Sequence, residues 1–229
     1  MKHLLPVLLI LLILLPQRGL AIDGVPEQKE LKFQILRDGE PFGTHHIKFE
    51  TEGDLIRADI SISMSLSLAF VKLFRYEHEN TEIWRDDQLV SIDAETNDNG
   101  KKSEVEAEQA DGKIRINGTA GSYEAPTDIA ASTYWSPQLI MQDKVLNSQK
   151  GTLKDIEIAK KEVEQVKVAG DYIPARRYQI TLPERVINVW YHTKTGQWVD
   201  LKFEIRGSEL DYYRLTPLKG NLIPARNGG

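Results

Sequence analysis

The chain has 229 residues, of which 29 are Lys or Arg and 34 are Asp or Glu, so its net charge is −5. An acidic chain is a poor partner for nucleic acid, because phosphate binding requires a basic surface. The chain contains no cysteine, which excludes a small domain held by disulfides and requires a hydrophobic core instead. A chain of this length can bury such a core as a single domain.

The first 21 residues have the pattern of a secretory signal peptide. Lys2 and His3 precede an apolar stretch at residues 4–15, and the small residues Gly19 and Ala21 follow it. A short basic start, about a dozen apolar residues and a small-residue site are typical of a cleaved signal. We therefore expect cleavage near Ala21, a periplasmic protein and no transmembrane span in the mature chain. An uncleaved anchor is the alternative, although a span needs about 20 apolar residues.

After the signal we expect a flexible lead-in at residues 22–30, one β domain at residues 31–216 and a C-terminal tail at residues 217–229. The domain opens with alternating patterns at residues 31–35 and 43–51. From Ile56 to Phe70 every even-numbered residue is apolar, while the odd-numbered ones are polar or small. Side chains of a strand alternate between two faces, so this run predicts one long strand of about 50 Å with one wet face and one dry face.

The strand patterns then continue as an antiparallel meander. They occupy residues 74–84, 90–96, 105–108 and 114–116, with Asn99-Gly100 and Asp111-Gly112 as hairpin turns. Residues 118–153 lose the alternation, and Ser132–Ile140 is expected to form one short helix. This irregular segment is expected to lie across the concave face of the sheet or to close one end, because long connections of this kind tend to be functional.

Strand patterns resume in the last third of the chain, at residues 155–158, 164–169, 175–182, 186–192, 199–205 and 209–215. An antiparallel sheet of about eleven strands has to curl or fold onto itself. The sequence therefore predicts an all-β fold: a long, strongly curved antiparallel sheet, like an open barrel or a clam, with at most a short helix. An outer-membrane barrel is the alternative, and the small partner residues around Glu104, Glu106 and Glu108 argue against it, because they make a poor lipid-facing band.

Aromatic residues are the best indication of a binding site. An aromatic cluster over a concave sheet provides an apolar site with polar groups, which suits a lipid or another amphiphile. Strand residues would form its wall and two residues of the irregular segment a lid. The alternative is that these rings simply form the core. The predicted ligand-binding residues are Tyr76, His78 and Trp84 in the wall, Tyr134 and Trp135 in the lid, and Trp190 in a late hairpin.

No catalytic residue, metal ligand or cofactor is predicted. His45 and His46 are adjacent in a strand and point to opposite faces, so they cannot ligate one metal ion. A zinc site made of His45, His78 and His192 would need three strands to converge and a fourth ligand. The serines of the long strand form a polar ladder without a nucleophile elbow.

Six segments resemble a family of secreted bacterial proteins known only as a domain of unknown function. The resemblance implies export and a β architecture, and it implies no catalytic residue. The late part of the chain, from the step Pro174-Ala175 onward, is also similar to other periplasmic β proteins, and the outline is similar to the curved-sheet lipoprotein carriers of the bacterial envelope. The segments are 73–78 (LFRYEH), 82–86 (EIWRD), 96–101 (TNDNGK), 132–135 (STYW), 146–151 (LNSQKG) and 189–191 (VWY).

These observations favour a non-catalytic function, the binding of an apolar or amphiphilic envelope molecule in a concave sheet. Two alternatives remain open from the sequence. The first is a module that pairs through a sheet edge with another envelope protein. The second is a hydrolase whose site is assembled from distant residues such as His78 and Glu82.

Overall fold

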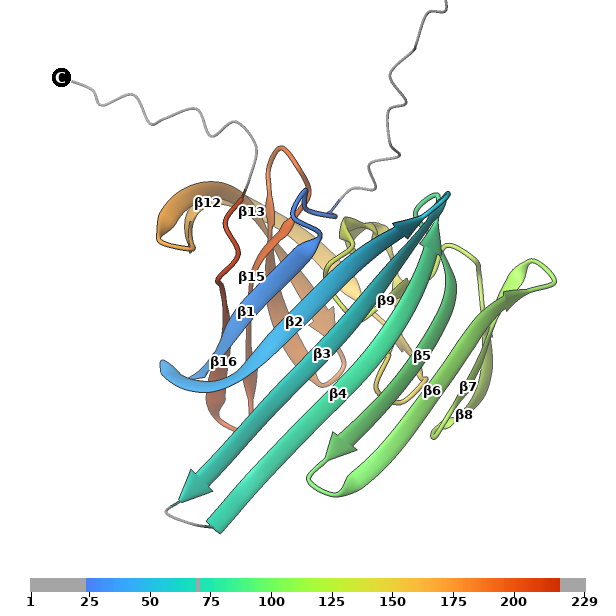
Figure 1. Cartoon of the computed structure of the whole chain (residues 1–229), viewed down its shortest axis with the longest axis horizontal. Coiled ribbons are helices and arrows are strands. Elements are labelled where there is room, and N and C mark those ends of the chain that lie inside the picture. Colours follow the sequence, from blue (N-terminus) through green and yellow to red (C-terminus); the bar gives the residue numbers. More distant parts are fainter. Residues whose placement is uncertain (1–23, 69–70, 219–229) are drawn as a thin grey trace, which may run out of the picture.

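The computed structural model describes residues 24–68 and 71–218, and most of these residues belong to β strands. The predicted signal peptide at residues 1–21, with its cleavage site at Ala21, lies outside the described residues, as do residues 219–229 of the predicted tail. Thirteen strands form one antiparallel sheet that curves around an interior without closing (Figure 1). The predicted all-β fold with a long, curved antiparallel sheet is thus confirmed.

The order of strands in the sheet explains how the chain encloses its interior. The N-terminal strands run from the middle of the sheet to one edge, and the C-terminal strands return from the other edge, in the order β12-β13-β14-β15-β16-β1-β2-β3-β4-β5-β6-β7-β8. The first eight are β1 (Glu30–Arg37), β2 (Glu40–Glu52), β3 (Leu55–Leu68), β4 (Val71–Arg85), β5 (Gln88–Asp98), β6 (Lys101–Ala110), β7 (Lys113–Gly118) and β8 (Gly121–Ala125). The last five are β12 (Glu157–Val168), β13 (Asp171–Leu182), β14 (Arg185–His192), β15 (Trp198–Ile205) and β16 (Ser208–Arg214).

β1 and β16, the first and last strands along the chain, pair with each other and so join the two halves of the sheet. β1 pairs with β16 in an antiparallel register that runs from Phe33 opposite Arg214 to Arg37 opposite Leu210. The predicted hairpin turns at Asn99-Gly100 and Asp111-Gly112 lie between β5 and β6 and between β6 and β7. At Asn99-Gly100 both residues have positive φ angles, 54° and 93°, which the tight turn requires and which Asn and Gly tolerate best.

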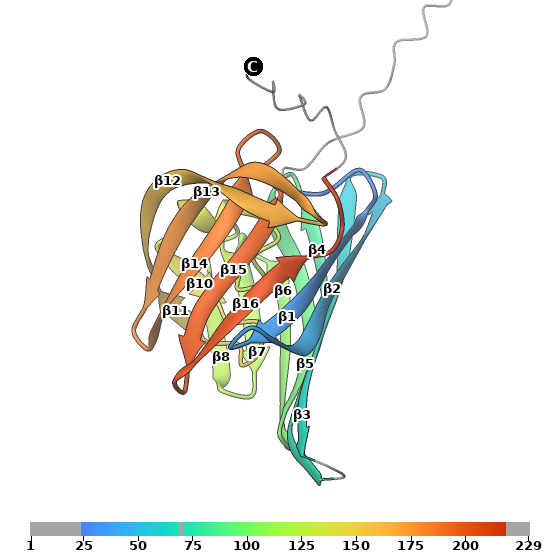
Figure 2. The same ribbon diagram turned by 90° about the vertical axis from the view of Figure 1, so that its left-hand side faces the viewer.

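The long alternating run forms β3, and the hairpin of β3 and β4 projects beyond the rest of the sheet (Figure 2). The even-numbered residues Ile56, Ala58 and Ile60 are buried, as the period-two pattern predicts. Toward the tip the same face becomes more open, and Leu66 is 38% exposed. A bulge between Leu66 and Ser67 shifts the register near the tip.

The first part of the stretch predicted to be irregular, residues 118–153, forms β8 of the main sheet. The irregular segment proper follows β8, and it packs into the interior of the curved sheet. After β8 it forms β9 (Ala130–Ala131), the short 3-10 helix η1 (Pro137–Met141), β10 (Lys144–Leu146) and β11 (Leu153–Asp155). β9, β10 and β11 make a separate three-stranded sheet. Many residues of the irregular segment belong to the main hydrophobic core, together with residues of β1–β7 and β14–β16. They include Ile129, Trp135, Leu139, Val145 and Leu146.

A second, smaller apolar cluster lies on the other side of the C-terminal strands. Trp190 belongs to this cluster whereas Tyr191 belongs to the main core, because adjacent strand residues point to opposite faces. β12 bends toward β15 and β16 and helps to cover the cluster (Figure 2). Its members are Val166, Val168, Ile173, Ala175, Trp190, Val199 and Leu218.

Both ends of the described chain pack against the body. Residues 24–29, which were expected to form a flexible lead-in, make turns in which Gly24 and Pro26 are buried. Gln28 Nε2 donates a hydrogen bond to the Pro217 carbonyl at 2.9 Å. A Cβ at Gly24 would lie 2.5 Å from the Trp135 carbonyl oxygen, so only glycine fits where the chain enters the domain.

Arg214, at the end of β16, is fully buried and ties three elements together. Its guanidinium donates to the Trp198 carbonyl at 2.7 Å, to Gln197 Oε1 at 2.8 Å and to the Thr216 carbonyl at 2.9 Å. Burial lowers the pKa of Arg214 to about 10, which leaves it charged at neutral pH. The residue therefore fixes the start of β15 and the last described residues relative to the joining strand.

We expect Arg214→Ala to lower the free energy of unfolding by about 2–3 kcal/mol, because three buried acceptors lose their donor. Urea titration followed by tryptophan fluorescence measures the loss. The matched control is Arg115→Ala, which removes an exposed ion pair with Asp111 and should leave the midpoint unchanged. Equal stability of the two variants would contradict the role given to Arg214.

Candidate functional site

The inward face of β4 carries polar side chains where a dry face would normally be apolar. Alternation places Tyr76, His78, Asn80, Glu82 and Trp84 on this face, and none of them is more than 8% exposed. We call the first four of these residues the polar strip. Buried polar groups are costly unless they are hydrogen-bonded, so their partners show what the strip does.

Glu82 fastens the irregular segment to the sheet. Its Oε2 atom accepts hydrogen bonds from the indole nitrogens of Trp84 at 2.9 Å and of Trp135 at 2.8 Å. Its Oε1 atom accepts one from Asn80 Nδ2 at 3.0 Å. Burial raises the pKa of Glu82, and the hydrogen bonds from Trp135, Trp84, Thr133 and Asn80 oppose that rise. The carboxyl group is thus the one acceptor shared by two indoles from different parts of the chain.

The same segment is held from the opposite wall by β14. Tyr191 Oη donates a hydrogen bond to the Tyr134 carbonyl at 2.8 Å. The Trp135 ring meets Trp84 edge to face at 5.3 Å and Phe49 at 5.2 Å, an arrangement that aromatic pairs prefer. Tyr134 has a φ of 63°, a left-handed conformation that costs energy in a residue other than glycine. Packing on both sides therefore maintains this turn.

A cavity of about 120 Å³ remains between the irregular segment and the sheet. Side chains of β2, β3, β4 and β14–β16 line it together with residues of the irregular segment. The lining is mixed. Ile62 and Phe203 are apolar, whereas His45, His78 and Tyr212 carry polar groups. Such a void suits part of a molecule that is apolar along its length and polar at one point.

Several buried polar atoms in this interior have no hydrogen-bond partner among the described residues. They are both ring nitrogens of His45, Tyr76 Oη and Asn80 Oδ1. Burial, together with the neighbouring His78 and His46, lowers the pKa of His45 to about 3. Burial also lowers the pKa of His78 to about 4, and its Nδ1 atom lies 2.8 Å from Thr96 Oγ1. Both imidazoles are therefore neutral at physiological pH.

The structure gathers five of the six predicted site residues around one interior, although only two of them reach the cavity. His78 and Tyr134 line it, whereas Trp84 and Trp135 are fully buried in the core. Tyr76 belongs to the polar strip. Trp190 lies apart from the other five, in the second cluster, where its indole nitrogen donates to Glu164 Oε2 at 2.9 Å.

His45, Glu82 and Tyr212 are interior residues that were not among the predicted ligand-binding residues, although the sequence analysis considered His45 for a zinc site and Glu82 for a hydrolase site. A signal for the first two was present. His45 alternates with Ile47 and Phe49, and Glu82 occupies an even-numbered position in the run that ends at Trp84. A polar residue in register with apolar ones marks a buried polar group. Tyr212 alternates with Leu210 in β16, but an aromatic residue in register with an apolar one does not distinguish a cavity residue from a core residue.

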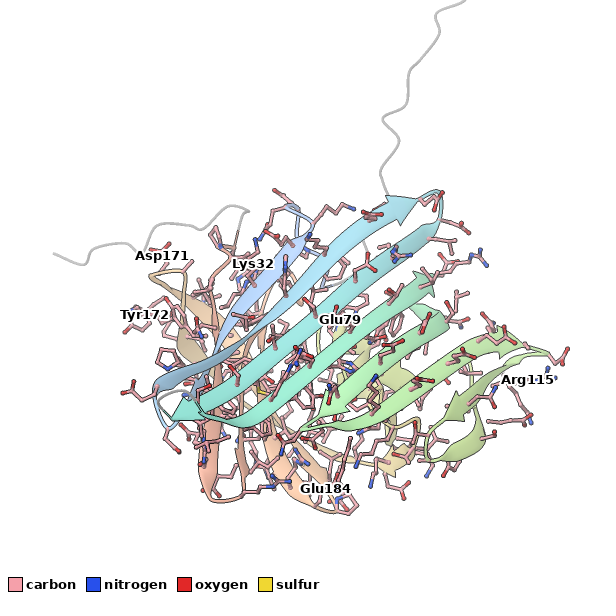
Figure 3. All side chains as sticks on the ribbon, turned by 60° about the horizontal axis from the view of Figure 1, so that its bottom comes forward. Lys32, Glu79, Arg115, Asp171, Tyr172 and Glu184 are labelled. Carbon is pink, nitrogen blue, oxygen red and sulfur yellow. The ribbon has the colours of Figure 1, made fainter. Side chains whose placement is uncertain are left out.

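The outer face of β2–β5 carries a second hollow, of about 400 Å³. Its lining includes His46, Lys48, Asp59, Glu79 and Asp93, and charged side chains surround Glu79 on this side (Figure 3). Burial and the nearby Glu77 raise the pKa of Glu79.

In the described ranges no group of three or more His, Cys, Asp or Glu residues could hold a metal ion. No helix in those same ranges is long and apolar enough to cross a membrane.

The curved, unclosed sheet defines a β-barrel-like class of protein. A solved structure from Brucella abortus, described as a beta-barrel-like protein of the domain of unknown function DUF1849, is similar with a TM-score of 0.58 at 9% identity. The match covers 81% of this chain and 94% of that one, and it shows a likeness of fold. The family model for the domain of unknown function DUF6134 matches residues 33–215. The chain belongs to that family. No curated protein matches its sequence.

Replacement of Glu82 by Leu should lower the free energy of unfolding by about 3 kcal/mol, because the indoles of Trp84 and Trp135 and the amide of Asn80 lose their acceptor. Glu82→Gln retains one acceptor oxygen and should cost about 1 kcal/mol. Because the pKa of Glu82 is raised on folding, wild type loses stability as pH rises above 4.5, whereas the Gln variant has no such loss. Urea titrations at pH 5 and pH 8 test both points. A Leu variant as stable as wild type would contradict the anchoring role.

Proposed function

We propose that the protein binds an apolar or amphiphilic, lipid-like molecule of the cell envelope in the concave interior of its sheet, and that it catalyses no reaction. In this proposal the predicted signal peptide delivers it to the periplasm. One observation carries the proposal: an interior void with several apolar side chains in its wall is also lined by His45, whose two buried ring nitrogens have no partner among the described residues. A bound molecule with an apolar body and a polar end would satisfy both properties.

The size of the cavity limits how much of the ligand it can hold. At about 120 Å³ it is smaller than the roughly 300–1,000 Å³ of a site for a drug-sized molecule. We therefore place one end of the ligand in the cavity and the remainder on the inward face of the β3–β4 hairpin. Ile62 lines the cavity, and Met64 and Leu66 follow on the same face toward the tip. The partly exposed apolar side chains of this face supply the surface for an acyl chain.

A sheet-edge interaction with another envelope protein is the first alternative. The sheet ends at β12 and β8, so these two strands present the unpaired edges. β12 carries Lys160, Lys161, Glu162 and Glu164, and charges of this kind blunt an edge against pairing. β8 has only five residues. Both features weigh against edge pairing as the main function.

The hydrolase alternative has less support from the geometry. Glu82 is engaged by two indoles and an amide, and His78 is paired with Thr96. A second carboxyl group, Asp200, has a pKa raised to about 8 by burial and by Asp211. Since Leu201 lines the cavity, its neighbour Asp200 points to the other side of the sheet. The pair of His78 and Glu82 therefore lies on the opposite face of the sheet from the pair of Asp200 and Asp211, and the two pairs do not form one site.

Binding can be measured with 1-N-phenylnaphthylamine, a neutral apolar fluorophore whose emission rises when it leaves water. We expect saturable binding by wild type and at least about tenfold weaker binding by Ile62→Trp, because the larger ring fills the cavity. Val186→Trp is the matched control. Val186 is 43% exposed and points away from the cavity, since its neighbour Ile187 lines it.

Native mass spectrometry of the protein purified from its own envelope provides the second measurement. A lipid or amphiphile that copurifies with wild type and is lost from Ile62→Trp would support the proposal. Unchanged fluorophore binding by both Trp variants, together with no copurifying molecule in repeated preparations, would refute it.

A further inference from the structure

His45 is a buried residue whose ring packs in the core but whose two ring nitrogens have no evident structural role. It lies on β2 between Phe33 of β1 and Ile62 of β3, and it is 3% exposed. The ring packs edge to face against Trp198 at 5.2 Å and Tyr212 at 5.9 Å. Neither ring nitrogen has a hydrogen-bond partner in the described part of the chain. The residue lines the cavity, so a molecule in that space can reach it.

An imidazole without partners costs stability in the free protein. A buried polar group that loses its water without gaining a protein partner is destabilising, and a phenylalanine would fill the same position without that cost. The contrast with His46, the next residue, is clear. His46 points to the outer face, where its Nε2 atom lies 2.7 Å from Glu30 Oε1. The unpartnered histidine is therefore the one that faces the cavity.

The protonation state of His45 defines the chemistry that it can recognise. A neutral imidazole has one N–H donor and one nitrogen acceptor on opposite sides of the ring. A carboxylate can only accept, and burying one beside a neutral ring would leave its charge uncompensated. An ammonium can only donate. A hydroxyl group both donates and accepts, so one hydroxyl can pair with whichever ring nitrogen faces it, with or without the proton.

The charged residues that line the cavity do not change this conclusion. They are Lys154, Glu184 and Arg185. The ammonium of Lys154 lies 3.8 Å from Glu184 Oε2, and the guanidinium of Arg185 lies over the Phe203 ring at 5.7 Å. All three side chains are partly or fully exposed, whereas His45 is enclosed by aromatic rings. The buried end of the cavity is the uncharged one.

We infer that His45 recognises the polar end of the bound molecule and that this end is an uncharged group that carries hydroxyls, as in a glycerol ester. The inference rests on the proposed function and adds to it a recognition residue and a ligand class. The polar end enters the cavity beside His45, and the acyl chain follows the hairpin face outward.

Displacement of 1-N-phenylnaphthylamine by three decyl-chain competitors tests the inference: monodecanoylglycerol, decanoate and decylammonium. Wild type should bind the glyceride at least about tenfold more tightly than either charged competitor. His45→Phe should lose about tenfold in affinity for the glyceride alone. Its melting temperature without ligand should rise by a few degrees, because the unpartnered nitrogens are gone. His46→Phe, the control on the opposite face, should retain the selectivity of wild type.

The outcomes separate the two levels of the proposal. If the fluorophore and all three competitors fail to bind, the proposed function is refuted and this inference falls with it. If decanoate binds as well as the glyceride, binding stands and the inference is overturned. That comparison uses wild type alone, so it holds even where a variant does not fold. If His45→Phe melts at a lower temperature and weakens all competitors equally, the nitrogens serve only ordered water and the inference is again overturned.

Discussion

One buried carboxyl group determines how this protein fills its interior. A curved sheet that does not close leaves its concave face open to water unless part of the chain covers it. Here the chain uses its own irregular segment, and Glu82 fixes the segment by accepting both the Trp84 and Trp135 indoles. Tyr191 holds the adjacent carbonyl from the far wall. A cavity of about 120 Å³ remains on the side where His45 and Tyr212 lie.

The hydrogen bonds of Glu82 to the two indoles also explain where the aromatic residues lie. An indole nitrogen needs an acceptor when it is buried, and Glu82 supplies one inside the core. Trp135 is therefore buried in the core in this structure, and its predicted role as part of a movable lid stays a prediction. Tyr134, its neighbour, is only partly buried and lines the cavity. Trp190 found its acceptor in Glu164 on the other side of the sheet.

The sequence predicted local features better than long-range ones. Period-two alternation identified the long β3 strand and the dry face on which Tyr76, His78 and Trp84 lie, because side-chain direction depends only on the local backbone. The pairing of β1 with β16 could not be predicted, since alternation does not say which distant strands meet. The same limit concealed the joint role of Glu82 and Trp135, which lie 53 residues apart. Fold class followed from local pattern, whereas the site depended on contacts between distant segments.

Exchange of the indole protons with solvent, measured by NMR on ¹⁵N-labelled protein, tests most directly whether the segment is fixed. If Glu82 holds it, the Trp84 and Trp135 indole protons exchange only through global unfolding, with the same dependence on denaturant. Fast exchange of the Trp135 proton while the Trp84 proton remains protected would contradict this account. That result would mean that residues around Trp135 open as a lid, and that the interior accepts far more than one end of a ligand.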